Sequence, residues 1–128
     1  MVKLGYAFQQ DGKKLYYSFS IFKHKFSKFS EKVLDIDKLA LRAQRLNPQI
    51  FPKNDNNEKI NLKGLSKLTF NCFGKPLDKR ECMSNWSNIP LRKEQLRYAA
   101  IDALVLIEIF DFIQNKCKNL DIDIEKLY

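Results

Sequence analysis

Tyr98 and Asp102 lie four residues apart in the segment QLRYAAIDALVLIEIF, residues 95–110, and their side chains could take part in chemistry. Residues at this spacing are neighbours on a helix, with Cβ atoms about 6 Å apart. A carboxylate is a ligand that hard divalent cations prefer, and an adjacent phenol could assist such a ligand. The same spacing also occurs in ordinary helices, with a solvated Asp and a half-buried Tyr. The pair alone leaves both interpretations open.

The helix that would carry this pair is expected from about Arg92 to Asn115, directly after Pro90. Tyr98 and Asp102 then fall on a face that adjoins an apolar stripe. The small alanines of the stripe would let another element or a substrate backbone approach closely. The stripe is predicted to contain Leu96, Ala99, Ala100, Ala103, Leu104, Ile107 and Phe110.

Five further elements are expected upstream of that helix. Residues 2–8 favour a strand, and the segment after Asp11 has Leu15, Phe19 and Phe22 at helical spacing. Residues 33–36 favour a short strand that leads into a helix ending at Pro48. A third helix should carry Leu62, Leu65, Leu68 and Cys72 on one face, with Asn61 as its N-cap and Gly74 after its last turn.

Composition narrows the possible functions. The 128 residues are 45% hydrophobic and 30% charged, which is typical of one globular domain. No apolar run is long enough to span a bilayer and the N-terminus has no secretory core, so we expect an intracellular protein without a membrane partner. The three cysteines form no Cys-x-x-Cys pair, which argues against a disulfide framework or zinc site and predicts mostly buried thiols. With His24 as the only histidine, catalysis would have to rest on carboxylates.

The net charge of +8 is unevenly distributed. Residues 1–80 contain 17 Lys and Arg against 7 Asp and Glu, whereas residues 81–128 contain 6 against 8. A basic body beside an acidic segment suits a protein that attracts a polyanion and keeps carboxylates for metal ions. Many basic proteins bind no nucleic acid, so charge alone does not decide this. The lysine-rich stretches 13–14, 23–28 and 79–80 are candidates for phosphate contacts.

A longer pattern is more specific. The segment GLSKLTFNCFGKPLDKRECMSNWSNIPLRKEQLRYAAIDALVLIEIF, residues 64–110, resembles the C-terminal stretch of the ribonuclease D-like 3′–5′ exonucleases of the DEDDy type. It is most similar to their Nibbler and mutator-type branch. The matching pieces are GLSKL, GKPLDK, SNW, PL, EQLRYAA and DA, in the family's order. KLGYAFQQDGKKL, residues 3–15, resembles the middle motif of the same family, in which a strand delivers an Asp to the site.

The resemblance implies an α/β fold of the ribonuclease H-like 3′–5′ exonuclease class and a two-metal mechanism with Mg²⁺ or Mn²⁺. By position, Asp102 would ligate a metal directly and Tyr98 would orient the attacking water. Asp11 would help to hold the second ion through water. Two cations about 4 Å apart can activate water and stabilise a departing 3′ oxygen. Trp86, within the third motif at 86–110, is expected to be a packing anchor rather than a platform for a base.

The family's first motif, an Asp-x-Glu on an opening strand, has no counterpart before residue 3. Two segments could substitute for it, and neither fits well. Asp123-Ile124-Glu125 follows the last helix, and Asp35-Ile36-Asp37 lies between the other two motifs and lacks the Glu. One direct and one indirect ligand cannot hold two dications against their mutual repulsion. Residues 1–128 are therefore expected to be the C-terminal portion of one exonuclease domain, with an incomplete metal site. This portion of the fold should be mostly helical. A missing N-terminal half or a protein partner would complete it.

Three functions remain open. The first is a 3′–5′ exonuclease that trims a single-stranded 3′ end, RNA more readily than DNA, with this chain inactive by itself. The second is a non-catalytic nucleic-acid-binding relative, or pseudo-exonuclease. The third is a structural remnant without activity. A truncated fragment and a genuinely degenerate protein are both compatible with the residues.

Overall fold

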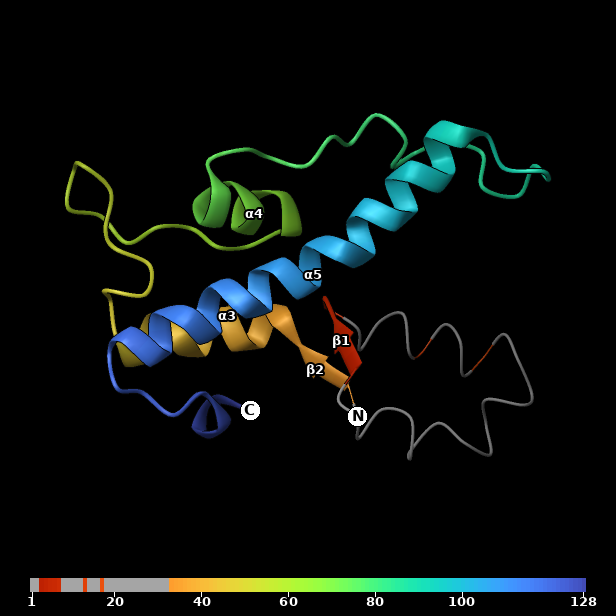
Figure 1. Ribbon diagram of the computed structural model, residues 1–128. Helices are drawn as coiled ribbons and strands as arrows, with labels where there is room; N and C mark the ends of the chain where they lie inside the picture. The colour runs from red at the N-terminus through yellow and green to blue at the C-terminus, as the bar shows by residue number, and fades with distance from the viewer. Residues whose placement is uncertain (1–2, 8–12, 14–16, 18–32) are drawn as a thin grey trace.

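The computed structural model describes residues 3–7, 13, 17 and 33–128 (Figure 1). Asp11 and the helix expected around Leu15, Phe19 and Phe22 lie outside the described residues, as do the lysines of 23–28. A long helix crosses the molecule, and the other elements pack along it. In chain order the elements are β1 (Lys3–Gly5), β2 (Val33–Asp35), α3 (Ile36–Leu46), α4 (Leu65–Phe73), α5 (Lys93–Asn119) and the 3-10 helix η1 (Ile124–Leu127).

The two described strands pair in parallel, with Leu4 opposite Leu34 and Gly5 opposite Asp35. Both strands fall within the segments that the sequence predicts, although β1 is shorter than residues 2–8. Asp35 ends β2 and caps α3, because its carboxylate accepts a hydrogen bond from the backbone N–H of Asp37 at 3.2 Å. The same carboxylate accepts from the N–H of Ala7 at 2.9 Å, just after β1. One side chain thus joins the carboxyl ends of both strands to the start of α3.

The helix α4 begins later than its sequence predicts. Its N-cap is Gly64, and Asn61 instead accepts a hydrogen bond from the N–H of Lys63 at 2.9 Å. The expected N-cap at Asn61 is therefore wrong, since the side chain closes a local turn before the helix starts. Gly74 ends α4 as predicted, with φ of 75°, a left-handed conformation that glycine adopts without a Cβ clash.

The hydrophobic core lies where α3 meets the C-terminal half of α5. Helix η1 and the segment between α3 and α4 close this core. The Phe51 and Phe112 rings add an aromatic contact, with centroids 5.9 Å apart. The buried apolar residues are Ile36, Leu39, Ala40, Ala43, Ile50, Phe51, Leu62, Leu68, Val105, Ile109, Ile113, Cys117, Ile124 and Leu127.

The apolar stripe predicted for α5 is wrong. The buried apolar row follows Val105, Ile109, Ile113 and Cys117, and of the predicted stripe only Phe110 is partly buried. Leu104 and Ile107 are 55% and 51% exposed. Apolar residues occupy most of this helix surface, so periodicity does not single out one face; the position of α3 does.

The three thiols are free, with Cys117 buried, Cys72 half-buried and Cys82 exposed, so burial of most thiols is only partly right. No helix in the described part of the chain combines the length and apolar character that crossing a bilayer requires.

Candidate active site

Tyr98 and Asp102 form one wall of a surface depression of about 550 Å³. The depression lies between α5, the end of β1, the start of α4 and the segment that precedes α5. Ala99 and Ala103 lie beside the two polar side chains, so the helix surface is open there, as expected from the small residues. The lining residues are Gly5, Tyr6, Leu65, Trp86, Tyr98, Ala99, Asp102, Ala103 and Leu106.

The phenol and the carboxylate influence each other's protonation. Burial raises the pKa of Asp102, and the hydrogen bond from the Tyr98 hydroxyl and the charge of Lys79 oppose this rise in part. Burial raises the pKa of Tyr98 to about 12, and contacts with Cys82 and with the charge of Asp102 add to this rise. At neutral pH Tyr98 therefore keeps its proton and acts as a hydrogen-bond donor rather than as a base.

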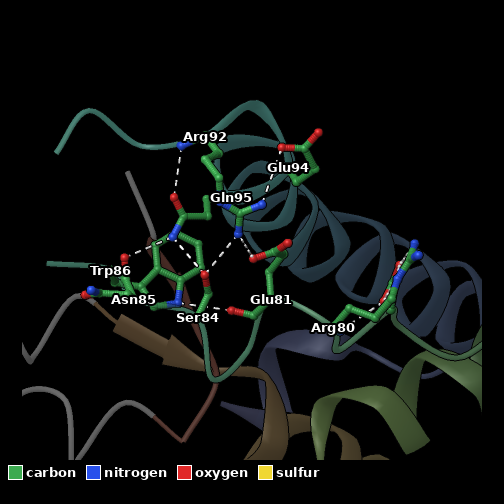
Figure 2. A network of polar contacts seen from close by, with 9 residues as sticks. Arg80, Glu81, Ser84, Asn85, Trp86, Arg92, Glu94 and Gln95 are labelled. Atoms are coloured by element: carbon green, nitrogen blue, oxygen red, sulfur yellow. Dashed lines mark hydrogen bonds and ion pairs between the residues drawn. The ribbon is translucent and has the colours of Figure 1, made fainter. Parts of the chain in front are cut away.

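A polar network holds the segment before α5 against the helix N-terminus (Figure 2). Gln95 is only 3% exposed, and its amide nitrogen donates to the Ser84 hydroxyl at 2.9 Å and to the Asn85 carbonyl at 3.1 Å. Its amide oxygen accepts from the N–H of Arg92 at 2.9 Å, as a glutamine at the third helical position does in a capping box. The Arg92 guanidinium reaches the Glu81 carboxylate at 2.6 Å. These hydrogen bonds therefore connect the SNW segment, residues 84–86, to the first turn of α5.

This network positions Trp86 beside Tyr98. The two ring centroids are 5.9 Å apart with an interplanar angle of 45°, and the indole N–H donates to the Glu81 carbonyl at 3.1 Å. Trp86 packs on Tyr98, as expected of an anchor, and it also lines the depression. The Tyr98 ring is therefore supported by residues on a separate segment of the chain.

Tyr6, directly after β1, also lines the depression. Its hydroxyl donates to the Asp37 carboxylate at 3.2 Å and accepts from the Gly64 N–H at 2.7 Å. These bonds join the end of β1 to the starts of α3 and α4. Burial, with the charge of Asp37, raises the pKa of Tyr6 to about 12, so this phenol also stays protonated. Sequence reasoning missed Tyr6, although it falls inside the predicted middle motif at residues 3–15.

The structure brings Tyr98 and Asp102 together as predicted, while Asp11, the third predicted site residue, lies outside the described residues. Neither considered substitute forms an Asp-x-Glu site. Asp35 caps α3, and Asp123 caps η1 with Ile124 buried beneath it. Sequence reasoning also missed Gln95, although its position three residues after Arg92 fits a capping box.

The described residues do not form a metal centre by themselves. No group of three or more His, Cys, Asp or Glu side chains among them could hold a cation. Asp102 is the one carboxylate that lines the depression, and it has a phenol donor beside it. It has the chemistry of a single oxygen ligand, and a dication needs several such ligands.

Comparisons with known proteins agree with this geometry. A sequence model of the 3′–5′ exonuclease family matches residues 1–118. The crystal structure of the Aedes aegypti Nibbler EXO domain matches with a TM-score of 0.75 and 33% identity, over 99% of this chain and 57% of that chain. The molecule therefore has the ribonuclease H-like exonuclease fold, of which the described residues supply mostly helices.

Individual proteins that are similar to this chain are also named exonucleases. An exonuclease mut-7 homolog from Aedes aegypti is 40% identical over 97 residues, which is 76% of this chain and 13% of that protein. Exonuclease mut-7 of Caenorhabditis elegans is 49% identical over 65 residues, 49% of this chain and 7% of that protein. The chain belongs to the 3′–5′ exonuclease family. It spans a small part of these relatives and about half of the solved domain.

Proposed function

We propose that this chain forms the Tyr-x-x-x-Asp side of a 3′–5′ exonuclease site that hydrolyses phosphodiester bonds from the 3′ end of RNA in preference to DNA. The observation that carries the proposal is the pairing of a protonated Tyr98 with Asp102 in the wall of the depression. A relative named ribonuclease D, from Shewanella, is 38% identical over 58 residues and supports RNA as the substrate.

Each side chain has a distinct role in the proposal. Asp102 supplies one oxygen ligand to divalent cations, Asp11 helps to hold the second ion through water, and sequence outside residues 1–128 supplies the other ligands. Mg²⁺ or Mn²⁺ ions, when bound, would provide a water of lowered pKa and charge stabilisation for the leaving oxygen. Tyr98 donates a hydrogen bond that orients the attacking water. Trp86 and the network around Gln95 keep the Tyr98 ring in place.

The electrostatics of the depression are compatible with a phosphodiester substrate. Lys79 is exposed and lies near enough to lower the pKa of Asp102, so its ammonium can also attract a phosphate at the rim. Ala99 and Ala103 leave space beside the two polar side chains for a sugar-phosphate backbone. The raised pKa of Asp102 means that binding a cation must release a proton from some molecules at mildly acidic pH.

The decisive experiment compares Asp102→Asn with Asp111→Asn, an exposed acid on the same helix. The protein that carries these residues is given 3′-labelled single-stranded RNA with and without Mg²⁺. Asp102→Asn should lower turnover by at least about a hundredfold and leave RNA binding intact, while Asp111→Asn should match the unmodified protein. Unchanged turnover in Asp102→Asn would rule the exonuclease proposal out.

Non-catalytic nucleic-acid binding is the second candidate, and the basic charge of residues 1–80 favours it. A surface that only binds phosphates should hold RNA without Mg²⁺, and its affinity should fall steeply with salt because counterions are released. Binding of this kind with no cleavage at any Mg²⁺ or Mn²⁺ concentration would support this candidate. Absence of RNA binding at low salt would exclude it.

A further inference from the structure

A second hollow lies on the other side of Tyr98 from Asp102, with a volume of about 410 Å³. Tyr98 lines both hollows, so its ring forms the boundary between them. Arg97 and Ile101, four residues apart on α5, line the second hollow, while Asp102 lines the first. Its lining residues are Pro76, Leu77, Asp78, Arg80, Glu81, Glu94, Arg97, Tyr98 and Ile101.

Three carboxylates and three guanidiniums balance in charge at this hollow, since Arg92 pairs with two of the carboxylates, and Arg97 is the guanidinium outside these ion pairs. Asp78 pairs with Arg80 at 2.5 Å, and Arg92 pairs with Glu81 at 2.6 Å and with Glu94 at 3.6 Å. All three carboxylates of the lining are therefore in ion pairs, some of which Figure 2 shows. Within the part of the chain that the structure describes, no carboxylate pairs with the exposed guanidinium of Arg97. An anionic ligand group would complement it.

The remaining walls are apolar or aromatic. Leu77, Pro76 and Ile101 supply flat aliphatic surface, and the Tyr98 ring supplies a face on which a base can stack. A hollow of this size falls within the range that binds small organic ligands. An apolar wall, an aromatic ring and one unpaired guanidinium together match a nucleotide, with its base against the wall and its phosphate on Arg97.

We propose that this second hollow binds one nucleotide, with Arg97 as the phosphate ligand and Tyr98, Leu77 and Ile101 as the base-contacting wall. The proposal rests on the proposed function, since it extends the substrate path past Tyr98 on the side away from Asp102. The bound nucleotide belongs either to the substrate strand or to the released mononucleotide, which share this chemistry. The contacts are to a base face and a phosphate, so little base preference is expected.

Calorimetric titration with adenosine 5′-monophosphate in EDTA tests the hollow without divalent cations. Arg97→Gln should weaken binding at least about tenfold, because glutamine keeps the helix and removes the charge-assisted bond. Ile101→Glu, which places a carboxylate in the hollow at an exposed position, should weaken it similarly. Arg45→Gln on α3, also exposed, should have no effect. Adenosine without its phosphate should bind more weakly than the monophosphate.

The outcomes separate this inference from the proposed function. Equal binding by Arg97→Gln and the unmodified protein, or no binding of the monophosphate, would overturn it. Loss of binding in Asp102→Asn would place the nucleotide in the first depression and overturn it as well. Tighter binding of a 5′-phosphorylated trinucleotide assigns the hollow to the strand, and equal or weaker binding assigns it to the product. Retained turnover in Asp102→Asn would defeat the exonuclease proposal and leave these binding results in place.

Discussion

Removal of the Gln95 side chain should release the segment that supports Tyr98. In Gln95→Ala, three hydrogen bonds are lost, to the Ser84 hydroxyl, the Asn85 carbonyl and the Arg92 N–H. Each neutral bond contributes about 1 kcal/mol net, which gives about 3 kcal/mol. The higher helix propensity of Ala offsets about 0.4 kcal/mol of this loss. Water can also hydrogen-bond to part of the backbone that the substitution exposes. The free energy of unfolding should therefore fall by about 2 kcal/mol.

Trp86 makes this change directly observable, because it is the only tryptophan of the chain. Urea unfolding followed by far-ultraviolet circular dichroism gives the stability. The emission spectrum of Trp86 and its quenching by acrylamide report whether its ring still packs on Tyr98. Gln95→Ala should show red-shifted emission and stronger quenching under native conditions.

Gln114→Ala is the matched control, since Gln114 is exposed on the same helix. Its stability should change by less than about 0.5 kcal/mol and its emission should stay constant. If Gln95→Ala behaves like this control in both stability and emission, the network does not hold Trp86, and the reasoning about the support of Tyr98 is refuted.

Three further predictions follow from the same geometry. Asp102→Asn should raise the free energy of unfolding at pH 7 without added metal, because burial raises the pKa of Asp102 on folding. An acid whose pKa is raised on folding destabilises the fold above that pKa, so the gain should shrink as the pH falls through the acidic range. Urea titrations in which the stability difference does not depend on pH would contradict this prediction. Tyr98→Phe should lower turnover at least about tenfold with little change in stability, measured by exonuclease assay and unfolding. Ile109→Ala, at a fully buried position, should lower the free energy of unfolding by about 2–5 kcal/mol. Ile107→Ala, at a position that is 51% exposed, should lower it by less than about 1 kcal/mol. Equal losses of stability in chemical denaturation would contradict the assigned core.

Much of the local structure could be predicted because it depends on residues close together in the chain. Both strands, the end of α4 at Gly74 and the start of α5 after Pro90 follow from propensities and stop signals. The buried face of α5 could not be predicted. Apolar side chains surround this helix, and its contacts with α3 and the other elements packed along it bury Ile109 rather than Ile107.

The amino-acid order alone determines that Tyr98 and Asp102 are neighbours, because backbone hydrogen bonds of a helix bring positions four apart onto one face. The family membership is likewise carried by residues 64–110 read in order. The support of Tyr98 by Trp86, the bridge from Tyr6 to Gly64 across 58 positions and the raised pKa of Asp102 arise only on folding. Solvent exclusion and long-range hydrogen bonds depend on side chains that meet in space, and no local pattern specifies which ones do.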